Sequence, residues 1–274
     1  MREAAGRAFW FFGAVLFTIS ACLFFVLDLA SGQSRELRIA AAADLKFAMD
    51  ELAEHYEKQA AVKVSTTYGS SGNFFSQIQS GAPFDLFFSA DIEYPRKLDA
   101  GGLVEQGTLY VYAVGRIVIW MPAKANIDLA KLGWKALLLA EIQKISIANP
   151  AHAPYGRAAV AALQRAGIYE KVRDKLVYGE NISQAAQFVQ SGNAQAGIVA
   201  LSLAISPAMQ DGKHWEVPAD SYPPIVQGAV ILKTARDKEA ARAFTAFVKG
   251  DVGQKTLERY GFAPSAAAMK SPAN

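Results

Sequence analysis

The chain has 274 residues, of which 52 % are hydrophobic and 19 % are charged, and its formal net charge at pH 7 is +3. This length allows one or two domains with sizeable cores, and a near-neutral charge without basic runs argues against a nucleic-acid partner. Cys22 is the only cysteine and lies in the apolar N-terminal segment. The rest of the chain therefore has neither a disulfide nor a thiol site.

Residues 1–32 are predicted to be an export signal or a membrane anchor. Two arginines precede an apolar run at 8–27, and small residues at 30–32 precede Gln33, a pattern typical of a cleaved signal. The run is also long enough to span a bilayer, and the four residues ending at Cys22 resemble a lipoprotein cleavage box. Cleavage, anchoring and lipidation all place the folded part outside the cytoplasm, which for this chain predicts the periplasm.

From Glu36 onward, short apolar strands alternate with stretches of helical spacing. Helices are predicted in the intervals between strands, among them one at 132–140, and the last two at 236–249 and 251–260. Strands are predicted at 37–41, 62–68, 84–90, 111–121, 145–148, 176–178, 196–200 and 225–232. This alternation predicts an α/β fold with mostly parallel sheets.

The longest predicted strands, 111–121 and 225–232, bracket a block with its own strands and helices. We therefore expect two lobes with a ligand cleft between them, and a chain that crosses from one lobe to the other twice. The predicted boundaries are 33–114 plus 227–274 for lobe 1 and 115–226 for lobe 2.

Four predicted strand-to-helix junctions consist of small, hydroxyl or Gly-Pro residues, at 42–44, 70–73, 154–156 and 180–183. In open α/β sheets, ligands bind outside the carboxyl ends of the strands, where helices begin. Each helix start offers free N–H groups and the positive end of the helix dipole. Four such starts facing one cleft would bind an oxyanion with neutral donors.

Four residues at these junctions have competing interpretations. Ser71 stands where an N-cap would stand, but its hydroxyl can also bind an anion. Tyr155, between a proline and a glycine, is either a donor to the ligand or a packed loop aromatic. A carboxylate repels an anion, so the sequence favours an N-cap role for Asp44 over ligand contact. Ile182 can offer a ligand only its backbone N–H.

Signals for catalysis are weak. The chain has no G-x-S-x-G, H-E-x-x-H or G-x-x-x-x-G-K-[ST] motif, and its three histidines have no metal-ligand spacing. No enzyme activity, bound metal or cofactor is therefore predicted. The alternative, an exported hydrolase of anionic esters, would need an activated nucleophile near Ser71, and the sequence places no His or Lys to activate it.

Seven segments resemble, in order, those of the periplasmic molybdate-binding proteins. The block Gly-Ala-Pro-x-Asp-Leu-Phe-x-Ser-Ala-Asp is a fairly specific mark of that family, and the similarity covers most of 37–262. The matching segments are 41–46, 69–75, 81–91, 112–116, 149–156, 179–183 and 197–200.

The resemblance implies a two-lobed type II periplasmic-binding fold that closes around a tetrahedral oxyanion. The implied ligand is molybdate, with tungstate as a co-ligand, and the implied partner is an ABC permease in the membrane; a monomer is expected. By motif match, Ser71, Tyr155 and Ile182 occupy ligand positions, with Ser70 and Asn181 as secondary candidates.

The first junction departs from the family pattern, which usually has Ser or Thr after Ala-Ala. Ala43 holds that place and Asp44 follows, although a one-residue shift of the alignment would put Asp44 there instead. Either way one expected hydroxyl is missing, and both residues remain candidate contacts. This change leaves sulfate or a phosphorus oxyanion as the alternative ligand.

Overall fold

The computed structural model describes residues 35–266. The predicted export signal or anchor at 1–32, with Cys22, lies outside the described residues. Glu36 begins a unit that is separate from the preceding segment, and the description below concerns that unit. No helix within 35–266 is both long enough and apolar enough to cross a bilayer.

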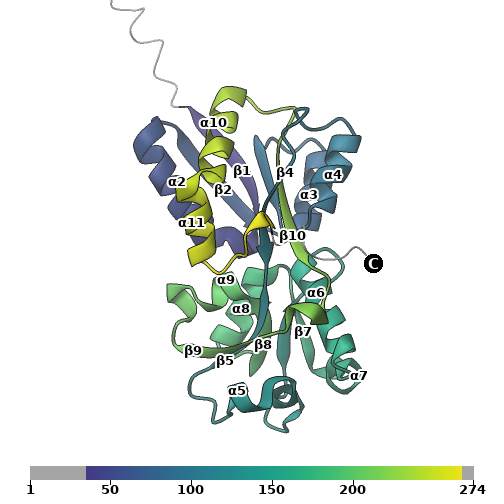
Figure 1. Cartoon of the computed structure of the whole chain (residues 1–274). Coiled ribbons are helices and arrows are strands. Elements are labelled where there is room, and N and C mark those ends of the chain that lie inside the picture. The colour runs from purple at the N-terminus through teal and green to yellow at the C-terminus, as the bar shows by residue number, and fades with distance from the viewer. Residues whose placement is uncertain (1–34, 267–274) are drawn as a thin grey trace, which may run out of the picture. The chain divides into compact units, whose positions relative to one another are not determined.

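The first lobe is built on a five-stranded sheet (Figure 1). In spatial order the strands are β2 (Lys63–Gly69), β1 (Glu36–Ala42), β3 (Leu86–Ser89), β10 (Ile225–Ile231) and β4 (Tyr110–Gly115). Strand β1 is parallel to both of its neighbours, whereas β10 is antiparallel to both of its neighbours.

The second lobe is built on another five-stranded sheet, again with two parallel and two antiparallel pairings. Its strands are, in order, β7 (Leu176–Gly179), β6 (Ile145–Ala148), β8 (Ala196–Ala200), β5 (Ile117–Pro122) and β9 (Gly212–Glu216). The predicted α/β class is confirmed, but both sheets are mixed. In each, the strand that arrives from the other lobe, β10 or β5, runs antiparallel to its neighbours.

The single strand predicted at 111–121 is wrong. The chain leaves the first sheet after β4 and enters the second with β5, and Arg116 lies between them. Its guanidinium donates to the carbonyl oxygen of Gly261 (3.0 Å) and to Glu216 (3.2 Å). Both halves are apolar and extended, so the sequence pattern carries no sign of the change of sheet.

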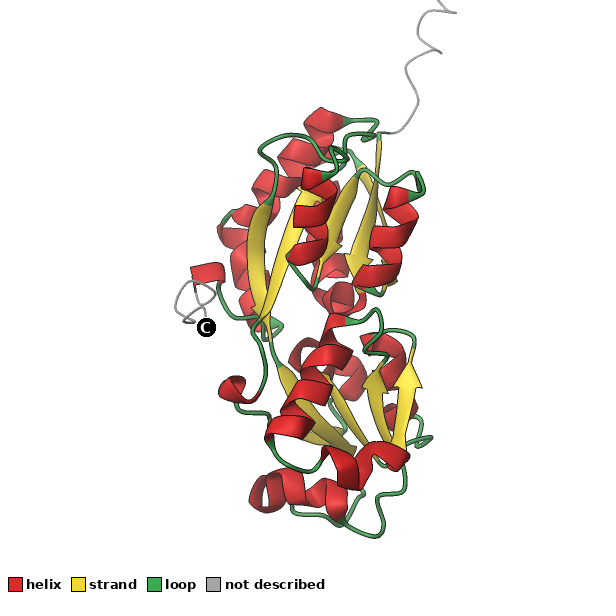
Figure 2. Cartoon of the chain, turned by 90° about the vertical axis from the view of Figure 1, so that its right-hand side faces the viewer, coloured by secondary structure: helices red, strands yellow, loops and turns green. Residues whose placement is uncertain are grey.

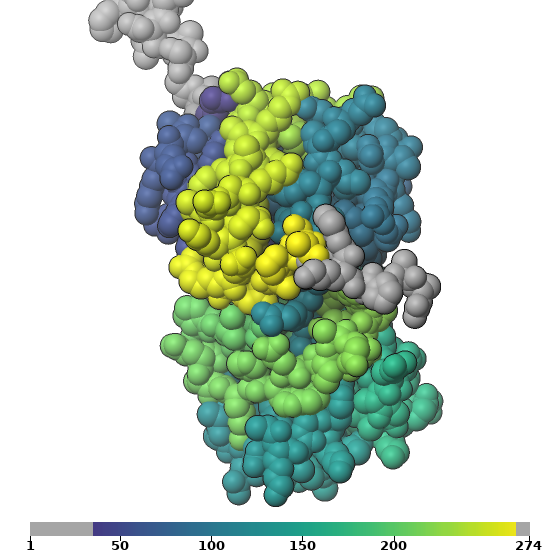
Figure 3. All heavy atoms as spheres, in the orientation of Figure 1, coloured from purple at the N-terminus to yellow at the C-terminus, as the bar shows by residue number. Residues whose placement is uncertain are grey.

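Helices cover both faces of the first sheet (Figure 2). The apolar residues of β1 enter different cores, because successive side chains of a strand point to opposite faces of the sheet: Leu37 and Ile39 pack with one set of helices, and Ala40 with the other. One set is α2 (Lys46–Ala60), α10 (Lys238–Lys249) and α11 (Asp251–Arg259), and the other is α3 (Ser71–Gln79) and α4 (Glu93–Ala100). In the space-filling view, α10 and α11 form a continuous surface over the first lobe (Figure 3).

The second lobe contains the longer helices α6 (Pro154–Arg165) and α8 (Ile182–Gln190), with the single-turn helices α7 (Tyr169–Val172) and α9 (Leu201–Ala204). The helix predicted at 132–140 is instead α5 (Leu129–Leu132) followed by a 3₁₀ segment at Gly133–Leu138.

A glycine explains the broken helix. Gly133 has φ +50°, and a Cβ on it would lie 3.1 Å from the Trp215 ring. The sequence analysis also missed β9, which contains Trp215. That strand is short, polar and at the edge of its sheet, so it lacks the apolar run by which the other strands were recognised.

Candidate functional site

Four strands are each followed by a helical segment, with at most five residues between, and residues from all four junctions line one small cavity. All seven residues proposed from the sequence as ligand contacts are among its lining residues. The lining residues are Ala42, Ala43, Asp44, Gly69, Ser70, Ser71, Ala90, Ala153, Pro154, Tyr155, Asn181 and Ile182. They come from both lobes, so the structure brings together the junctions that the sequence singled out.

Two helix starts from the second lobe each present one N–H group to this cavity. The first N–H groups of a helix have no partner within the helix. In α8, the N–H groups of Ser183 and Gln184 donate to the Asn181 side chain (3.0 and 3.1 Å). Among the described residues, nothing accepts from the N–H of Ile182, the first residue of α8.

Helix α6 repeats this arrangement. Pro154 has no N–H, and the N–H groups of Gly156 and Arg157 donate to the carbonyl oxygen of Ala153 (3.0 and 3.2 Å). Within residues 35–266, the N–H of Tyr155 has no acceptor. The Ile182 and Tyr155 N–H groups are therefore available to an anion at the positive ends of two helix dipoles.

Ser71 supplies donors from the first lobe. Its Oγ accepts from the N–H of Ala90 (2.9 Å), so the hydroxyl proton remains free to donate. The predicted N-cap role of Ser71 is wrong: Ser70 holds the N-cap position and Ser71 is the first helical residue. Ser70 Oγ does not cap α3 either, because it donates across to the carbonyl oxygen of His152 in the second lobe (2.7 Å).

Asp44 lies in the middle of a buried polar network. Its side chain is 1 % exposed, and Oδ2 accepts from Tyr155 Oη (2.9 Å) and from Gln227 Nε2 (2.7 Å). Its other oxygen, Oδ1, is buried without a partner among the described residues. Burial raises the pKa of Asp44 to about 6, and the hydrogen bonds from Gln227 and Tyr155 oppose that rise.

The predicted N-cap role of Asp44 is also wrong. The turn at this junction is a 3₁₀ segment, Ala43–Leu45, whose N-cap is Ala42 and which has no side-chain cap. The carboxyl group is instead hydrogen-bonded to the Tyr155 phenol and to the Gln227 side-chain amide. The preference of Asp for the N-cap position is outweighed here by its hydrogen bonds to residues that are distant in the sequence.

Gln227 is the part of this network that the sequence analysis missed. It is fully buried on β10, where Oε1 accepts from Tyr112 Oη (2.7 Å) and Nε2 donates to both Asp44 and Tyr155. The signal was present in the sequence: a glutamine in the middle of an apolar strand must have hydrogen-bond partners when buried.

The predicted packing role of Tyr155 is confirmed, and its contact with a ligand stays a prediction. The phenol is packed inside the protein, where it donates to Asp44 and accepts from Gln227 (3.0 Å), so only the backbone N–H of this residue remains for a ligand. Gly115 makes room for the ring, because a Cβ there would lie 2.2 Å from Tyr155 Oη. Burial raises the pKa of the phenol, which therefore stays neutral.

A Ser-His-Glu arrangement crosses the lobes but does not form a hydrolase triad. His152 Nδ1 lies 3.0 Å from Ser70 Oγ, and Nε2 lies 3.6 Å from Glu180. The single hydroxyl proton of Ser70 already goes to the His152 carbonyl, so Nδ1 must donate to Oγ and cannot act as its base. Within the described residues there is also no cluster of three His, Cys, Asp or Glu that could hold a metal ion.

The cavity is narrow because the lobes are held together around it. Gly72 N donates to His152 O (3.0 Å), Asn73 Nδ2 to Glu180 (2.5 Å) and Ser183 Oγ to Ala43 O (2.9 Å). The enclosed volume is about 10 Å³, roughly what one water molecule needs. A tetrahedral oxyanion is larger, so its entry requires the lobes to separate and the junctions to shift.

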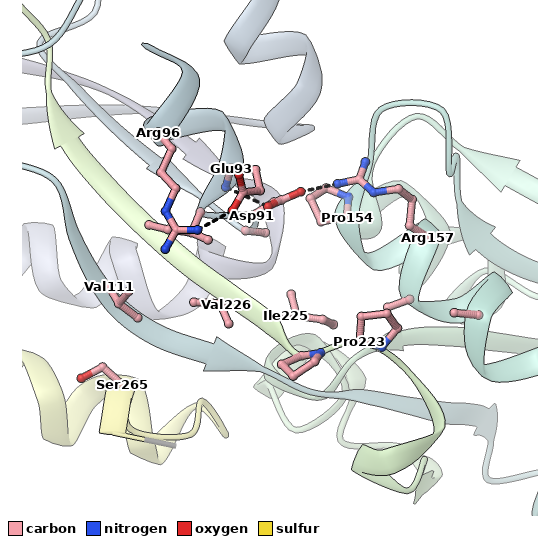
Figure 4. Close-up of a pocket in the computed structure, with 15 residues that line it drawn as sticks. Asp91, Glu93, Arg96, Val111, Pro154, Arg157, Pro223, Ile225, Val226 and Ser265 are labelled. Atoms are coloured by element: carbon pink, nitrogen blue, oxygen red, sulfur yellow. Dashed lines mark hydrogen bonds and ion pairs between the residues drawn. The ribbon is translucent and has the colours of Figure 1, made fainter. Parts of the chain in front are cut away.

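A larger hollow of about 740 Å³ lies beside the cavity and shares Ala90 and Pro154 with it. Its charged side chains pair with one another, Arg157 with Asp91 and Arg96 with Glu93 (both 2.5 Å; Figure 4). The rest of its wall is largely apolar, and both of its arginines are already paired with carboxylates. The small polar cavity is the better candidate site.

Two α/β lobes whose helix starts converge on a buried cavity define a two-lobed solute-binding protein. Residues 37–263 match the family of bacterial extracellular solute-binding proteins, and the chain belongs to that family. The predicted fold class and the recognised family are confirmed.

The chain is 40 % identical over 238 residues to the molybdate-binding protein ModA of Azotobacter vinelandii, a match that covers 85 % of this chain and 91 % of that one. It is 37 % identical over 227 residues to ModA of Rhodobacter capsulatus, covering 83 % and 88 %. The solved structure of the Azotobacter vinelandii periplasmic molybdate-binding protein has a TM-score of 0.78 at 35 % identity, covering 83 % of this chain and 98 % of that one. These relatives are binding proteins rather than enzymes.

Proposed function

We propose that this protein captures molybdate outside the cytoplasm and delivers it to an ABC permease. The observation that carries the proposal is the convergence of three longer helix starts on one cavity, with the N–H groups of Ser71, Tyr155 and Ile182 and the Ser71 hydroxyl as donors. We infer that the oxyanion is molybdate because the similar proteins are molybdate-binding proteins.

Neutral donors suit this task. Helix dipoles and N–H groups bind a dianion without a counter-charge, and a rigid ring of donors discriminates by ligand size. We assign Ser71, Tyr155 and Ile182 as direct contacts, with Ala43 and Asp44 as the contacts at the first junction. Ser70 and Asn181 have supporting roles, because Ser70 Oγ and Asn181 Oδ1 already bond within the protein.

Tungstate, which has the same shape and charge as molybdate, is the proposed co-ligand. The first junction favours keeping a second candidate, sulfate or a phosphorus oxyanion, because a carboxyl group stands beside the place where the family usually has a hydroxyl. Isothermal titration of the purified protein with molybdate, tungstate, sulfate and phosphate separates these ligands. Tight binding of molybdate and tungstate with no heat from sulfate supports the proposal, and a preference for sulfate or phosphate refutes it.

The mature protein is proposed to be a periplasmic monomer released by cleavage before Gln33, which would dock both lobes onto the permease. Mass spectrometry of the exported protein checks the cleavage site. An N-terminus at Gln33 is expected. An intact Met1 would instead indicate a retained anchor, and a lipidated Cys22 would indicate a lipoprotein.

A further inference from the structure

The Asp44 carboxyl sits in the proposed oxyanion site without a positive partner. This inference rests on the proposed function and concerns the same cavity. Within residues 35–266, no Lys, Arg or His forms an ion pair with Asp44, and Oδ1 is its one side-chain oxygen without a hydrogen bond. An ionised carboxylate in this place would repel a dianion across a buried, low-dielectric cavity.

The elements around Asp44 offer no compensating charge. Helices α8 and α9 and strand β10 contain no charged side chain. The nearby tyrosines have their pKa raised by burial and stay neutral. Charged groups near the junctions pair elsewhere: Lys46 pairs with Asp50 (3.0 Å), Lys63 with Glu36 (3.8 Å), Arg157 with Asp91 (2.5 Å) and His152 with Glu180 (3.6 Å).

We propose that Asp44 binds the oxyanion as a neutral carboxylic acid and donates a hydrogen bond from Oδ1, so that each captured oxyanion brings one proton from solvent into the site. The hydrogen bonds fix which oxygen holds the proton. Oδ2 already accepts from Tyr155 and Gln227, so the proton belongs on Oδ1. On release of the oxyanion, the proton returns to solvent.

This role accounts for the changed first junction. Where the resemblance leads us to expect a serine or threonine hydroxyl, the chain has Ala43 followed by a carboxyl group. A protonated carboxyl supplies the same kind of O–H donor, and it is a stronger one. The cost is that the donor exists only when a proton is available.

The pKa of about 6 for Asp44 sets the pH range of the effect. If only the protonated form binds, the apparent affinity is scaled by the protonated fraction of the free protein. That fraction is about one half at pH 6 and about one hundredth at pH 8, so the affinity for molybdate should fall about 50-fold between these values. Below pH 6 the affinity should approach a plateau.

Calorimetric titration with molybdate at pH 7.5, in two buffers of different ionisation enthalpy, measures the proton uptake directly. We expect about one proton taken up per molybdate for the native protein and none for Asp44→Asn, whose affinity should not change between pH 6 and 8. Asp99→Asn is the matched control, because Asp99 is an exposed carboxyl at the end of α4. It should retain the proton uptake of the native protein.

Three results would overturn the inference. One is molybdate binding without proton uptake, and another is an Asp44→Asn variant that keeps the native pH dependence. The third is a preference for hydrogen phosphate, because an ionised Asp44 would then be accepting the proton that this ligand carries. The first two results leave the proposed function standing. The third also refutes molybdate as the ligand, and absence of heat with every oxyanion refutes the proposed function itself, and this inference with it.

Discussion

Replacing Asp44 with asparagine should stabilise the unliganded protein, and the gain should depend on pH. The folded-state pKa of Asp44 is raised from 3.8 to about 6, so the folded protein holds this proton more tightly than the unfolded chain. The stabilisation due to the proton is fully present below pH 3.8 and is lost as the pH rises through 6. Above that range, folding buries an unpaired carboxylate.

The size of the effect follows from the shift. A difference of about two pKa units corresponds to about 3 kcal/mol at 1.36 kcal/mol per unit, and no discount for solvent applies because the carboxyl is buried. The difference in unfolding free energy, Asp44→Asn minus native, should therefore be constant below about pH 4. It should then increase by about 3 kcal/mol by pH 7.5.

Urea unfolding followed by tryptophan fluorescence, at pH 4, 5, 6 and 7.5 and without oxyanion, measures this difference. Ligand must be absent because its binding would add its own stabilisation. Taking the difference between variants removes the contributions of the other carboxylates, and Asp99→Asn should show no such trend. A difference that stays flat with pH would mean that Asp44 keeps an ordinary pKa, and one that decreases with pH would mean that an unrecognised cation stabilises its charge.

Three further variants test the site. Ser71→Ala removes a hydroxyl donor and should weaken molybdate binding by roughly 1.5–3 kcal/mol; an unchanged Kd by calorimetry would remove the hydroxyl from the site. Ala43→Ser should tighten binding at pH 8, where the Asp44 proton is scarce, and no gain would mean that the backbone N–H groups suffice. Gly72→Ala would put a Cβ 2.6 Å from His152 O, so it should hold the lobes apart and weaken binding while the urea midpoint changes little; native affinity would show that closure at this contact is not needed.

Much of the fold could be predicted because its signals are local. A buried strand such as β8 reads as a continuous apolar run, and helices show their period of 3.6. The errors arose where two alternatives share the same local pattern. The chain changes sheet at Arg116, a single charged residue between two apolar, extended segments, and the polar edge strand β9 has no apolar run to recognise.

For the site too, local features could be predicted from the sequence, and relations between distant residues could not. The four junctions were recognisable because a helix start after a strand has a characteristic local composition, and the resemblance selected Ser71, Tyr155 and Ile182 among their residues. Whether these residues bind the oxyanion stays a prediction. Their convergence on one cavity is a tertiary fact, since more than 80 residues separate Ser71 from Tyr155.

By itself, the sequence determined the α/β class and the family, and it predicted anion binding at the junctions, because each depends on residue types at short spacing. Only the tertiary structure decided the surroundings of Asp44. Its partners, Tyr155 and Gln227, lie 111 and 183 residues further along the chain. Among the described residues, no basic side chain pairs with Asp44, and this too depends on the elements that surround it. A pKa depends on burial and on neighbours in space, which short spacing along the chain does not encode.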